Sequence, residues 1–415
     1  FYADMNGYWR ANKEGLLLHN SIPDSTIEMQ VGRIDFSPLS AKSKARELAL
    51  LRQYFDKNHH WRMGLLGDLR EAYGQSKHLV TEQNALRNIV GPRAFTEGGH
   101  HDIGDTKPWL WGVDFGAATG EPYKTTGPGG AVFTLNFGSN KQLINRGGNL
   151  MTALLAQPWY PLSSGWGGRP SWWLHHMALG GTVGQAHMRT VNNGQAELPY
   201  RETMDYFPTG RYLWRNPIWV NLLGDPTARA FILSPPSQVR VTQAEGGGMR
   251  ISWQASPDPD TSGYRLYRAA PEEPEVFKPL TPSEPVTELF FQDGEGQAGA
   301  RYMVRAYGLK DVYAGSFYTL SQGAFSTSGT DRPRSFHLTA RATEPAALPD
   351  VFNTPQDGMI HAIIEPPEIG IVALTDAGWT YTAPVGFTGS VSLRFAASGT
   401  WDTQTGTMTF DVTAP

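Results

Sequence analysis

The chain of 415 residues contains no cysteine. This absence excludes disulfide frameworks, thiolate metal sites and cysteine nucleophiles. Charged residues are also scarce, at 18% of the chain, and the net charge is −4. Because a nucleic-acid-binding domain typically carries a basic face, we expect no nucleic-acid partner. We also expect no transmembrane segment, because no apolar run reaches the roughly 18 residues that a membrane-spanning helix needs. No signal peptide is recognisable.

Glycine (46 residues) and proline (30 residues) are abundant, which favours turn-rich β structure. The composition changes along the chain, and most of the tryptophans and histidines lie before Ser234-Pro235-Pro236. We therefore predict a multidomain chain with an α/β domain over residues 1–233 and β-sandwiches over residues 236–328 and 332–415. Because Phe1-Tyr2-Ala3-Asp4 reads as the interior of a strand and lacks an initiator methionine, we expect that part of the first domain precedes it.

The first zone alternates strand-like and helix-like segments, which predicts a mainly parallel sheet with helices on its faces. The segment 41–59 has apolar residues at helical spacing, with Ser40 as its N-cap. Its predicted apolar face consists of Ala45, Leu48, Leu51 and Phe55. The other predicted elements are strands at 29–36, 131–137 and 160–166 and helices at 148–157 and 170–179.

Residues 236–328 carry short alternating strands separated by turn clusters such as Ser256-Pro257-Asp258-Pro259-Asp260. Trp253 lies on the second of these strands, Gly263–Arg268 reads as the third, and Tyr302–Tyr307 begins another with a tyrosine. In these features the segment resembles a fibronectin type III domain. The resemblance implies a two-sheet sandwich in which Trp253 and Tyr302 are core residues.

The last zone, residues 332–415, is also strand-like. Its segment Gly378–Pro384, followed by Gly386-Phe387-Thr388-Gly389, resembles the end of bacterial immunoglobulin-like or cadherin-like repeats. We expect the last strand at 407–412. The acidic turns that bind calcium in cadherin-like repeats are poorly represented here.

Several separated segments in the first zone carry a further resemblance. Tyr2-Ala3-Asp4-Met5-Asn6-Gly7-Tyr8-Trp9 precedes the strand motif Val31-Gly32-Arg33-Ile34 and a helix containing Glu47, and Asn221-Leu222-Leu223-Gly224-Asp225-Pro226-Thr227 lies near the end of the zone. Their order resembles the peptidase domain of the gingipain-type cysteine peptidases. The resemblance implies a caspase-like α/β fold and a catalytic cysteine and histidine.

The chain departs from this family at both catalytic positions. The resemblance places the cysteine at the end of the strand 131–137, where this chain has Asn136-Phe137-Gly138-Ser139. It places the histidine in the turn after the preceding strand, where this chain has Gly116-Ala117-Ala118 if that strand is 109–115. A thiolate beside an imidazole is what makes such a peptidase nucleophilic near neutral pH. The sequence therefore predicts a pseudopeptidase.

An alternative site would use a serine in place of the cysteine. Ser139 needs a positioned base to act as a nucleophile, and His100 with Asp102 or Asp105 is the nearest such group in the sequence. The same histidine loop, which includes His101, contains metal-capable side chains, although a zinc site needs three or four converging ligands. A Gly-Ser step and a His-rich loop are more often a tight turn and a solvated loop.

Three weaker patterns complete the candidates. Asp4 and Asn6, with Asn12, faintly resemble a calcium loop, but Arg10 and Lys13 would repel the ion. His175 and His176 would point about 100° apart on a helix, which makes a paired role improbable, although His187 could lie near one of them. The tryptophans that could stack on sugars, with apolar neighbours that favour a core role instead, are Trp159, Trp166, Trp172 and Trp173.

Together these features predict a non-catalytic structural or interaction protein of bacterial origin, secreted or on the cell surface. We expect its partners to be other extracellular proteins or glycans. A hydrolase with a repurposed Ser139/His100 or metal site, and a glycan-binding protein based on exposed tryptophans, are the alternatives. No cofactor is expected, and Asp4 and Asn6 are weak candidate ligands for calcium.

Overall fold

The computed structural model describes residue 13 and residues 26–39, 43–75, 80–98, 107–114, 130–136, 149–166, 172–192, 221–281, 284–326, 335–353, 360–375, 377–398 and 403–414. The chain divides into two compact units. The first comprises Phe1–Tyr54, Asp68–Phe231 and Val312–Ser316, and the second comprises the remaining three segments. Each unit is described by itself.

The first unit is built on a six-stranded sheet in the order β2-β1-β3-β4-β5-β6. Neighbouring strands from β2 to β5 are parallel, and β6 is antiparallel to β5. This arrangement confirms the predicted mainly parallel sheet. Its strands are β1 (Ala72–Gln75), β2 (Phe95–Thr96), β3 (Pro108–Asp114), β4 (Gly130–Asn136), β5 (Ser163–Trp166) and β6 (Leu222–Gly224).

Every residue of strand β4 is buried. A continuous apolar run is typical of a parallel strand that is covered on both faces. The ring of Phe133 stacks on Trp111 of the neighbouring β3, with centroids 5.1 Å apart. The predicted strand at 131–137 is confirmed, and it occupies the interior of the sheet.

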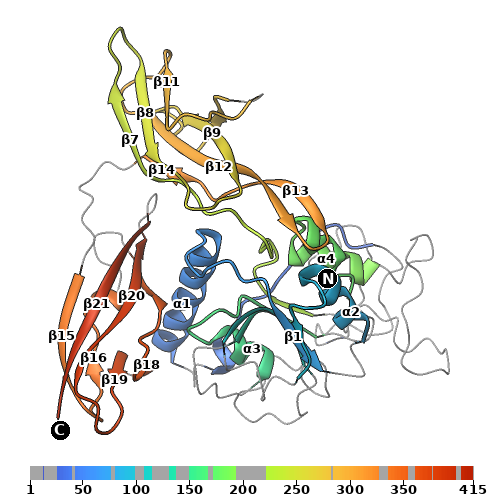
Figure 1. The fold of residues 1–415 in the computed structure, drawn as a ribbon, viewed down its shortest axis with the longest axis vertical. Coiled ribbons are helices and arrows are strands. Elements are labelled where there is room, and N and C mark those ends of the chain that lie inside the picture. Colours follow the sequence, from blue (N-terminus) through green and yellow to red (C-terminus); the bar gives the residue numbers. More distant parts are fainter. Residues whose placement is uncertain are drawn as a thin grey trace. The chain divides into compact units, whose positions relative to one another are not determined.

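Helices alternate with the strands of this sheet along the chain (Figure 1). Asn149 caps α3 by accepting a hydrogen bond from the backbone N–H of Thr152 at 3.2 Å, so the predicted helix at 148–157 is confirmed in a shorter form. The elements are η2 (Ser37–Leu39), α1 (Lys44–Arg62), α2 (Val80–Val90), α3 (Leu150–Leu155), η4 (His175–Leu179) and α4 (Val183–Asn192).

The predicted apolar face of α1 is wrong. Leu48 and Phe55 have 42% and 54% of their surface exposed, whereas Leu50 and Tyr54 are buried. The buried face of the helix includes Tyr54, whose phenol hydroxyl donates to the backbone oxygen of Leu162 at 2.7 Å. The helix begins after Ser43, whose carbonyl accepts from Glu47 N–H, and the predicted cap Ser40 lies outside the described residues.

Two further predictions are corrected. Residues 29–36 do not form a buried strand: only Phe36 is fully buried, and a single parallel bridge joins Arg33 to Leu223. The predicted helix at 170–179 is limited to the five-residue 3₁₀ turn η4, among the residues described there. Gly180 ends this turn with a left-handed φ of 83°.

The second unit contains two sandwiches of paired sheets. The first sandwich pairs the sheet β10-β9-β12-β13, with β14 on β12, with the sheet β11-β8-β7. Its core joins both sheets and includes Ile251, Trp253, Leu266 and Tyr302, as the alternation of its strands predicts. The strands are β7 (Ser237–Gln243), β8 (Met249–Gln254), β9 (Thr261–Ala269), β10 (Lys278–Pro279), β11 (Phe290–Asp293), β12 (Arg301–Val312), β13 (Gly315–Leu320) and β14 (Ala324–Phe325).

Tyr302 at the start of β12 anchors the first sandwich in a distinctive way. Its hydroxyl donates to the carboxylate of Asp293 at 2.9 Å, and Arg268 donates to the same carboxylate at 2.8 Å. In a tyrosine corner of a β-sandwich the hydroxyl typically bonds to a backbone group. Here its acceptor is instead the buried carboxylate of Asp293. Burial and the adjacent Asp293 raise the pKa of Tyr302 far above its usual range.

The second sandwich pairs the sheet β15-β21-β20-β17 with the sheet β16-β19-β18. The ring of Tyr381 on β19 stacks on Phe410 of β21 with centroids 4.2 Å apart, which joins the two sheets. A short 3₁₀ turn, η6 (Asp350–Phe352), lies between β16 and β17. The strands are β15 (Ser335–Arg341), β16 (Ala346–Ala347), β17 (Ile360–Glu365), β18 (Ile371–Thr375), β19 (Gly378–Thr382), β20 (Gly389–Ser398) and β21 (Thr403–Thr413).

The chain is therefore mostly β structure distributed over several sheets. Strands β7–β14 lie within the predicted range 236–328 and β15–β21 within 332–415. Within the described residues, no helix is both long and apolar enough to span a membrane.

Candidate functional site

The expected catalytic positions follow two neighbouring strands. Strands β3 and β4 are parallel, and their last residues, Asp114 and Asn136, are in register. Their carboxyl ends therefore lie side by side, at the edge where α/β sheets usually bind ligands. The turns that follow these strands, at 115–129 and 137–148, lie outside the described residues. So do all the predicted site residues in them and elsewhere: Ser139, His100, His101, Asp102, Asp105, Asp4 and Asn6.

The described end of β4 is a buried hydrogen-bonding network. The side-chain amide of Asn136, only 3% exposed, donates to the hydroxyls of Thr134 at 3.3 Å and Ser164 at 3.1 Å. Thr134 in turn donates to the backbone oxygen of Ser163 at 3.1 Å. A neutral amide is neither a nucleophile nor a general base near neutral pH. The network therefore ties β4 to β5 and supplies no catalytic group.

The structure brings together the two motifs at residues 31–34 and 221–227. Arg33 donates its N–H to the carbonyl of Leu222 at 3.1 Å, and its own carbonyl accepts from Gly224 N–H at 2.8 Å. Gly32 packs so closely on this pair that a Cβ there would overlap the carbonyl oxygen of Gly224. The two motifs thus form a single piece of backbone architecture around β6.

The second motif also receives contacts from two helices. Its Asp225 donates a backbone N–H to the hydroxyl of Tyr54 on α1 at 2.6 Å, and its carboxylate caps the N–H of Thr227 at 2.8 Å. The carbonyl of Pro226 accepts from Gly184 N–H on α4 at 2.8 Å. These motif residues hold helices against the sheet edge, so their presence indicates a fold and not an activity.

Histidines and tryptophans gather around η4 and α4. The rings of His175 and His176 lie 4.0 Å apart between centroids, which corrects the expectation that the two side chains diverge. The two residues lie on the 3₁₀ turn η4 instead of the predicted α-helix. The ring of His187 lies 5.5 Å from that of Trp172, measured between centroids.

The tryptophans of this region serve mainly as core residues. Trp166 and Trp172 are 6% and 1% exposed. Trp172 is held to two other elements: its backbone N–H donates to the carboxylate of Glu82 on α2 at 2.9 Å, and its indole N–H donates to the carbonyl of Trp166 on β5 at 2.8 Å. These two rings cannot stack on a sugar, and this favours the core interpretation over the glycan one.

The histidine pair predicts a pH dependence of stability. Burial, His175 and Arg189 lower the pKa of His176 to about 4 from its usual 6.5. Between these two values the unfolded chain binds a proton that the folded chain does not, so stability falls as pH drops through this window. We expect His176→Gln to flatten the decline in melting temperature between about pH 7 and pH 4.

The exposed His337 on β15 supplies the matched control, as His337→Gln. Thermal unfolding of the full chain across the pH series measures both variants. An acid decline that is the same in His176→Gln as in the parent chain would contradict the assignment.

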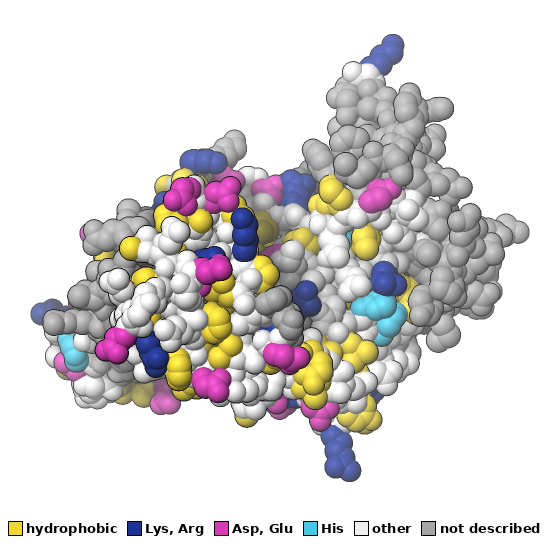
Figure 2. Space-filling model, turned by 90° about the horizontal axis from the view of Figure 1, so that it is seen from above, with side chains coloured by type: hydrophobic (Ala, Val, Ile, Leu, Met, Phe, Trp, Pro, Cys, Tyr) yellow, Lys and Arg dark blue, Asp and Glu magenta, His cyan; other side chains and the backbone are white. Residues whose placement is uncertain are grey.

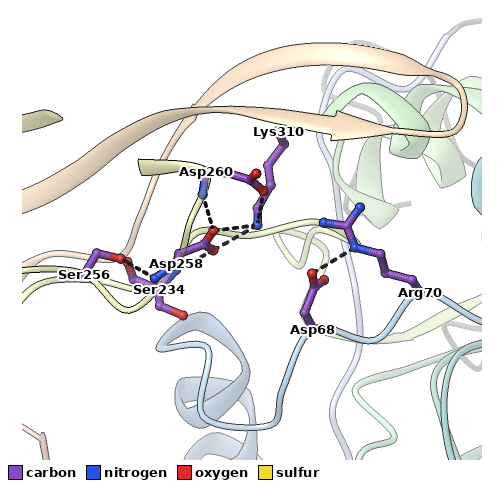
Figure 3. A network of polar contacts seen from close by, with 7 residues as sticks. All are labelled: Asp68, Arg70, Ser234, Ser256, Asp258, Asp260 and Lys310. Carbon is purple, nitrogen blue, oxygen red and sulfur yellow. Dashed lines mark hydrogen bonds and ion pairs between the residues drawn. The ribbon is translucent and has the colours of Figure 1, made fainter. Parts of the chain in front are cut away.

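A buried ionic cluster lies in the first sandwich (Figure 3). Lys310 of β12 is 2% exposed, and its ammonium lies 2.9 Å from both Asp258 and Asp260 in the β8–β9 turn. Asp258 also accepts from the backbone N–H of Asp260 at 3.1 Å and of Ser234 at 3.4 Å. The cluster fastens the turn to the strand, and every charge in it has a partner.

The described residues contain no group of three or more His, Cys, Asp or Glu side chains that is arranged to hold a metal ion. On the face shown in Figure 2, acidic and basic side chains are interspersed and no large patch of one sign is visible among the coloured residues. Such a surface is unlike the basic stripe that nucleic acids need.

No protein-family model matches the chain, and no curated protein matches it. Among solved structures, the chain is similar to a fibronectin type III-like protein from Clostridium thermocellum, at 13% identity and a TM-score of 0.18, over 25% of this chain and 99% of that one. It is also similar to titin kinase and its flanking domains, at 11% identity and a TM-score of 0.16, over 42% of this chain and 29% of that one. Both likenesses are weak, and neither carries information about function.

Proposed function

We propose that the chain is a non-catalytic interaction protein, secreted or at the cell surface, whose first domain is a pseudopeptidase of the gingipain type. Its partners on this proposal are other extracellular proteins or glycans. The proposal rests on two observations taken together: the backbone contacts between the motif residues, and the absence of a cysteine that could act as nucleophile. The motif residues around Gly32 and Gly224 form close backbone contacts, while the whole chain contains no cysteine.

The strand arrangement supports the same proposal. The resemblance implies that the catalytic histidine and cysteine follow two consecutive strands, and β3 and β4 are adjacent, parallel and in register at their ends. After these two strands the sequence has Gly116-Ala117-Ala118 and Phe137-Gly138-Ser139, with neither a histidine nor a cysteine. Tandem β-sandwiches after such a domain suit a spacer or an adhesive role.

A peptidase assay tests the proposal. We expect the full chain to show no turnover of gingipain-type peptide substrates, with and without added reductant, because the sequence has no cysteine and no histidine at the positions that the resemblance assigns to the dyad. An active cysteine peptidase in the same assay confirms that the substrates are competent. Turnover that disappears in Ser139→Ala or His100→Ala would replace the proposal with a serine hydrolase, and turnover that disappears with a chelator would indicate a metal site.

A further inference from the structure

The outer face of the sheet formed by β9, β12 and β13 carries a cluster of arginines and tyrosines. Side chains alternate along β12, so that Tyr302, Val304 and Ala306 point into the core. Arg305 and Tyr307 therefore stand on the opposite face. They are joined there by Arg265 from β9 and Tyr318 from β13, and we name these four residues the Arg-Tyr face.

Three of these side chains form a ladder across the strands. The guanidinium carbon of Arg265 lies 5.2 Å from the ring centroid of Tyr307, within the range of a cation–π contact. Tyr307 stacks in turn on Tyr318, with centroids 5.2 Å apart and planes inclined by 3°. Tyr318 ends the ladder and is 62% exposed, so its ring is available to a ligand.

The two arginines of this face are neighbours of like charge. Arg265 and Arg305 are direct cross-strand partners in the β9–β12 register, where like charges are destabilising. Both are anchored to backbone: Arg265 donates to the carbonyl of Thr281 at 2.6 Å and Arg305 to that of Ser321 at 2.7 Å. An anion bound between two fixed guanidinium groups would relieve their repulsion and would cost little reorganisation.

We propose that the Arg-Tyr face binds an acidic polysaccharide made of uronic acids. One sugar ring stacks its C–H face on Tyr318, and carboxylates of the same chain bind Arg265 and Arg305. A uronic acid carries a flat C–H face and a carboxylate on one rigid ring, whereas an acidic peptide side chain offers only the carboxylate. The inference adds a ligand class to the proposed interaction role, and it concerns the first sandwich and not the peptidase-like domain.

Binding of polygalacturonate fragments to the full chain, measured by calorimetry, tests the inference. We expect binding that weakens with added salt, and no binding of neutral dextran. Arg305→Gln should weaken binding by about tenfold or more, since a charged hydrogen bond is worth about that much. Tyr318→Ala should also weaken binding, because it removes the ring on which the sugar stacks. The control is Arg250→Gln, which removes an arginine stacked on Phe290 in the other sheet and should leave binding unchanged.

Two results would overturn the inference: no binding of polygalacturonate, or binding that Arg305→Gln and Tyr318→Ala leave unaltered. Poly-glutamate or single-stranded DNA that binds this face as tightly as polygalacturonate would also overturn it, in favour of an acidic protein or a nucleic acid. Because the peptidase assay concerns another domain, the failure of either proposal is distinguishable from failure of the other.

Discussion

Lys310→Ala is expected to lower the free energy of unfolding of the first sandwich by about 3–5 kcal/mol. The ammonium of Lys310 lies 2.9 Å from Asp258 and from Asp260, and the side chains of Lys310 and Asp258 are 3% and 9% exposed. Removal of the lysine leaves two carboxylates close together, one of them buried, without a counter-charge. Chemical denaturation of the full chain, followed by the fluorescence of tryptophans such as Trp253 in the core of this sandwich, measures the change.

The matched control is Lys278→Ala in the same sandwich. Lys278 is 76% exposed and lies 3.9 Å from Glu273, and an exposed pair of this kind contributes about 0–1 kcal/mol. Replacement of the whole cluster, by Lys310→Met with Asp258→Asn and Asp260→Asn, should be milder than Lys310→Ala because no buried charge is left unpaired. Equal effects of Lys310→Ala and Lys278→Ala would show that the cluster does not stabilise the sandwich.

Gly224→Ala should destabilise the first unit by at least about 3 kcal/mol. Gly224 has a φ of 107°, a conformation that side-chain-bearing residues rarely adopt, and a Cβ there would overlap the carbonyl oxygen of Leu162. The substitution would push β6 away from β5 and break the bond from Gly224 N–H to Arg33. We expect a soluble yield well below that of the parent chain and a lower unfolding midpoint for this unit.

Gly67→Ala separates backbone strain from steric overlap. Gly67 also has a positive φ, of 84°, but a Cβ there meets no atom within 4 Å. It should therefore cost only about 1 kcal/mol, the conformational part of the effect. If Gly224→Ala proved as mild as Gly67→Ala, the motif at 221–227 would not be the close-packed junction described above.

Strand positions were predictable where the pattern of apolar residues was simple. The continuous run of mostly apolar residues at 131–137 predicts a fully buried strand, and the structure has one. The alternation through Tyr302, Val304 and Ala306 predicts a strand buried on one face, which the structure also has. The same alternation assigns position 310 to the core side, so it contains the signal for a buried lysine. The sequence predicts a turn at 256–260 but not its ionic cluster. The two aspartates of the turn pair with Lys310, which lies about fifty residues further along the chain.

The face of α1 could not be predicted from hydropathy, for a physical reason. Phe55 and Leu48 are apolar but exposed, whereas Tyr54 is buried because its hydroxyl bonds to the backbone of Leu162 and Asp225. Such partners depend on the tertiary fold. The proximity of the His175 and His176 rings was not predictable either, because helical spacing fixes the direction of each Cβ and not the side-chain rotamers.

The motifs at 31–34 and 221–227 resemble a peptidase, but their residues make backbone contacts and supply no catalytic side chain. Gly32, Arg33 and Gly224 meet because a close backbone approach needs glycine on both sides. The positions that the resemblance assigns to catalysis lie beyond the ends of β3 and β4, outside the described residues.

Intact-mass analysis of the full chain after incubation with a serine-reactive fluorophosphonate tests the central claim most directly. The account predicts no added mass beyond that of the heat-denatured chain treated in the same way, because no activated nucleophile follows β4. A single stoichiometric adduct that maps to Ser139, and that is lost in His100→Ala, would contradict the claim and identify the chain as a working hydrolase.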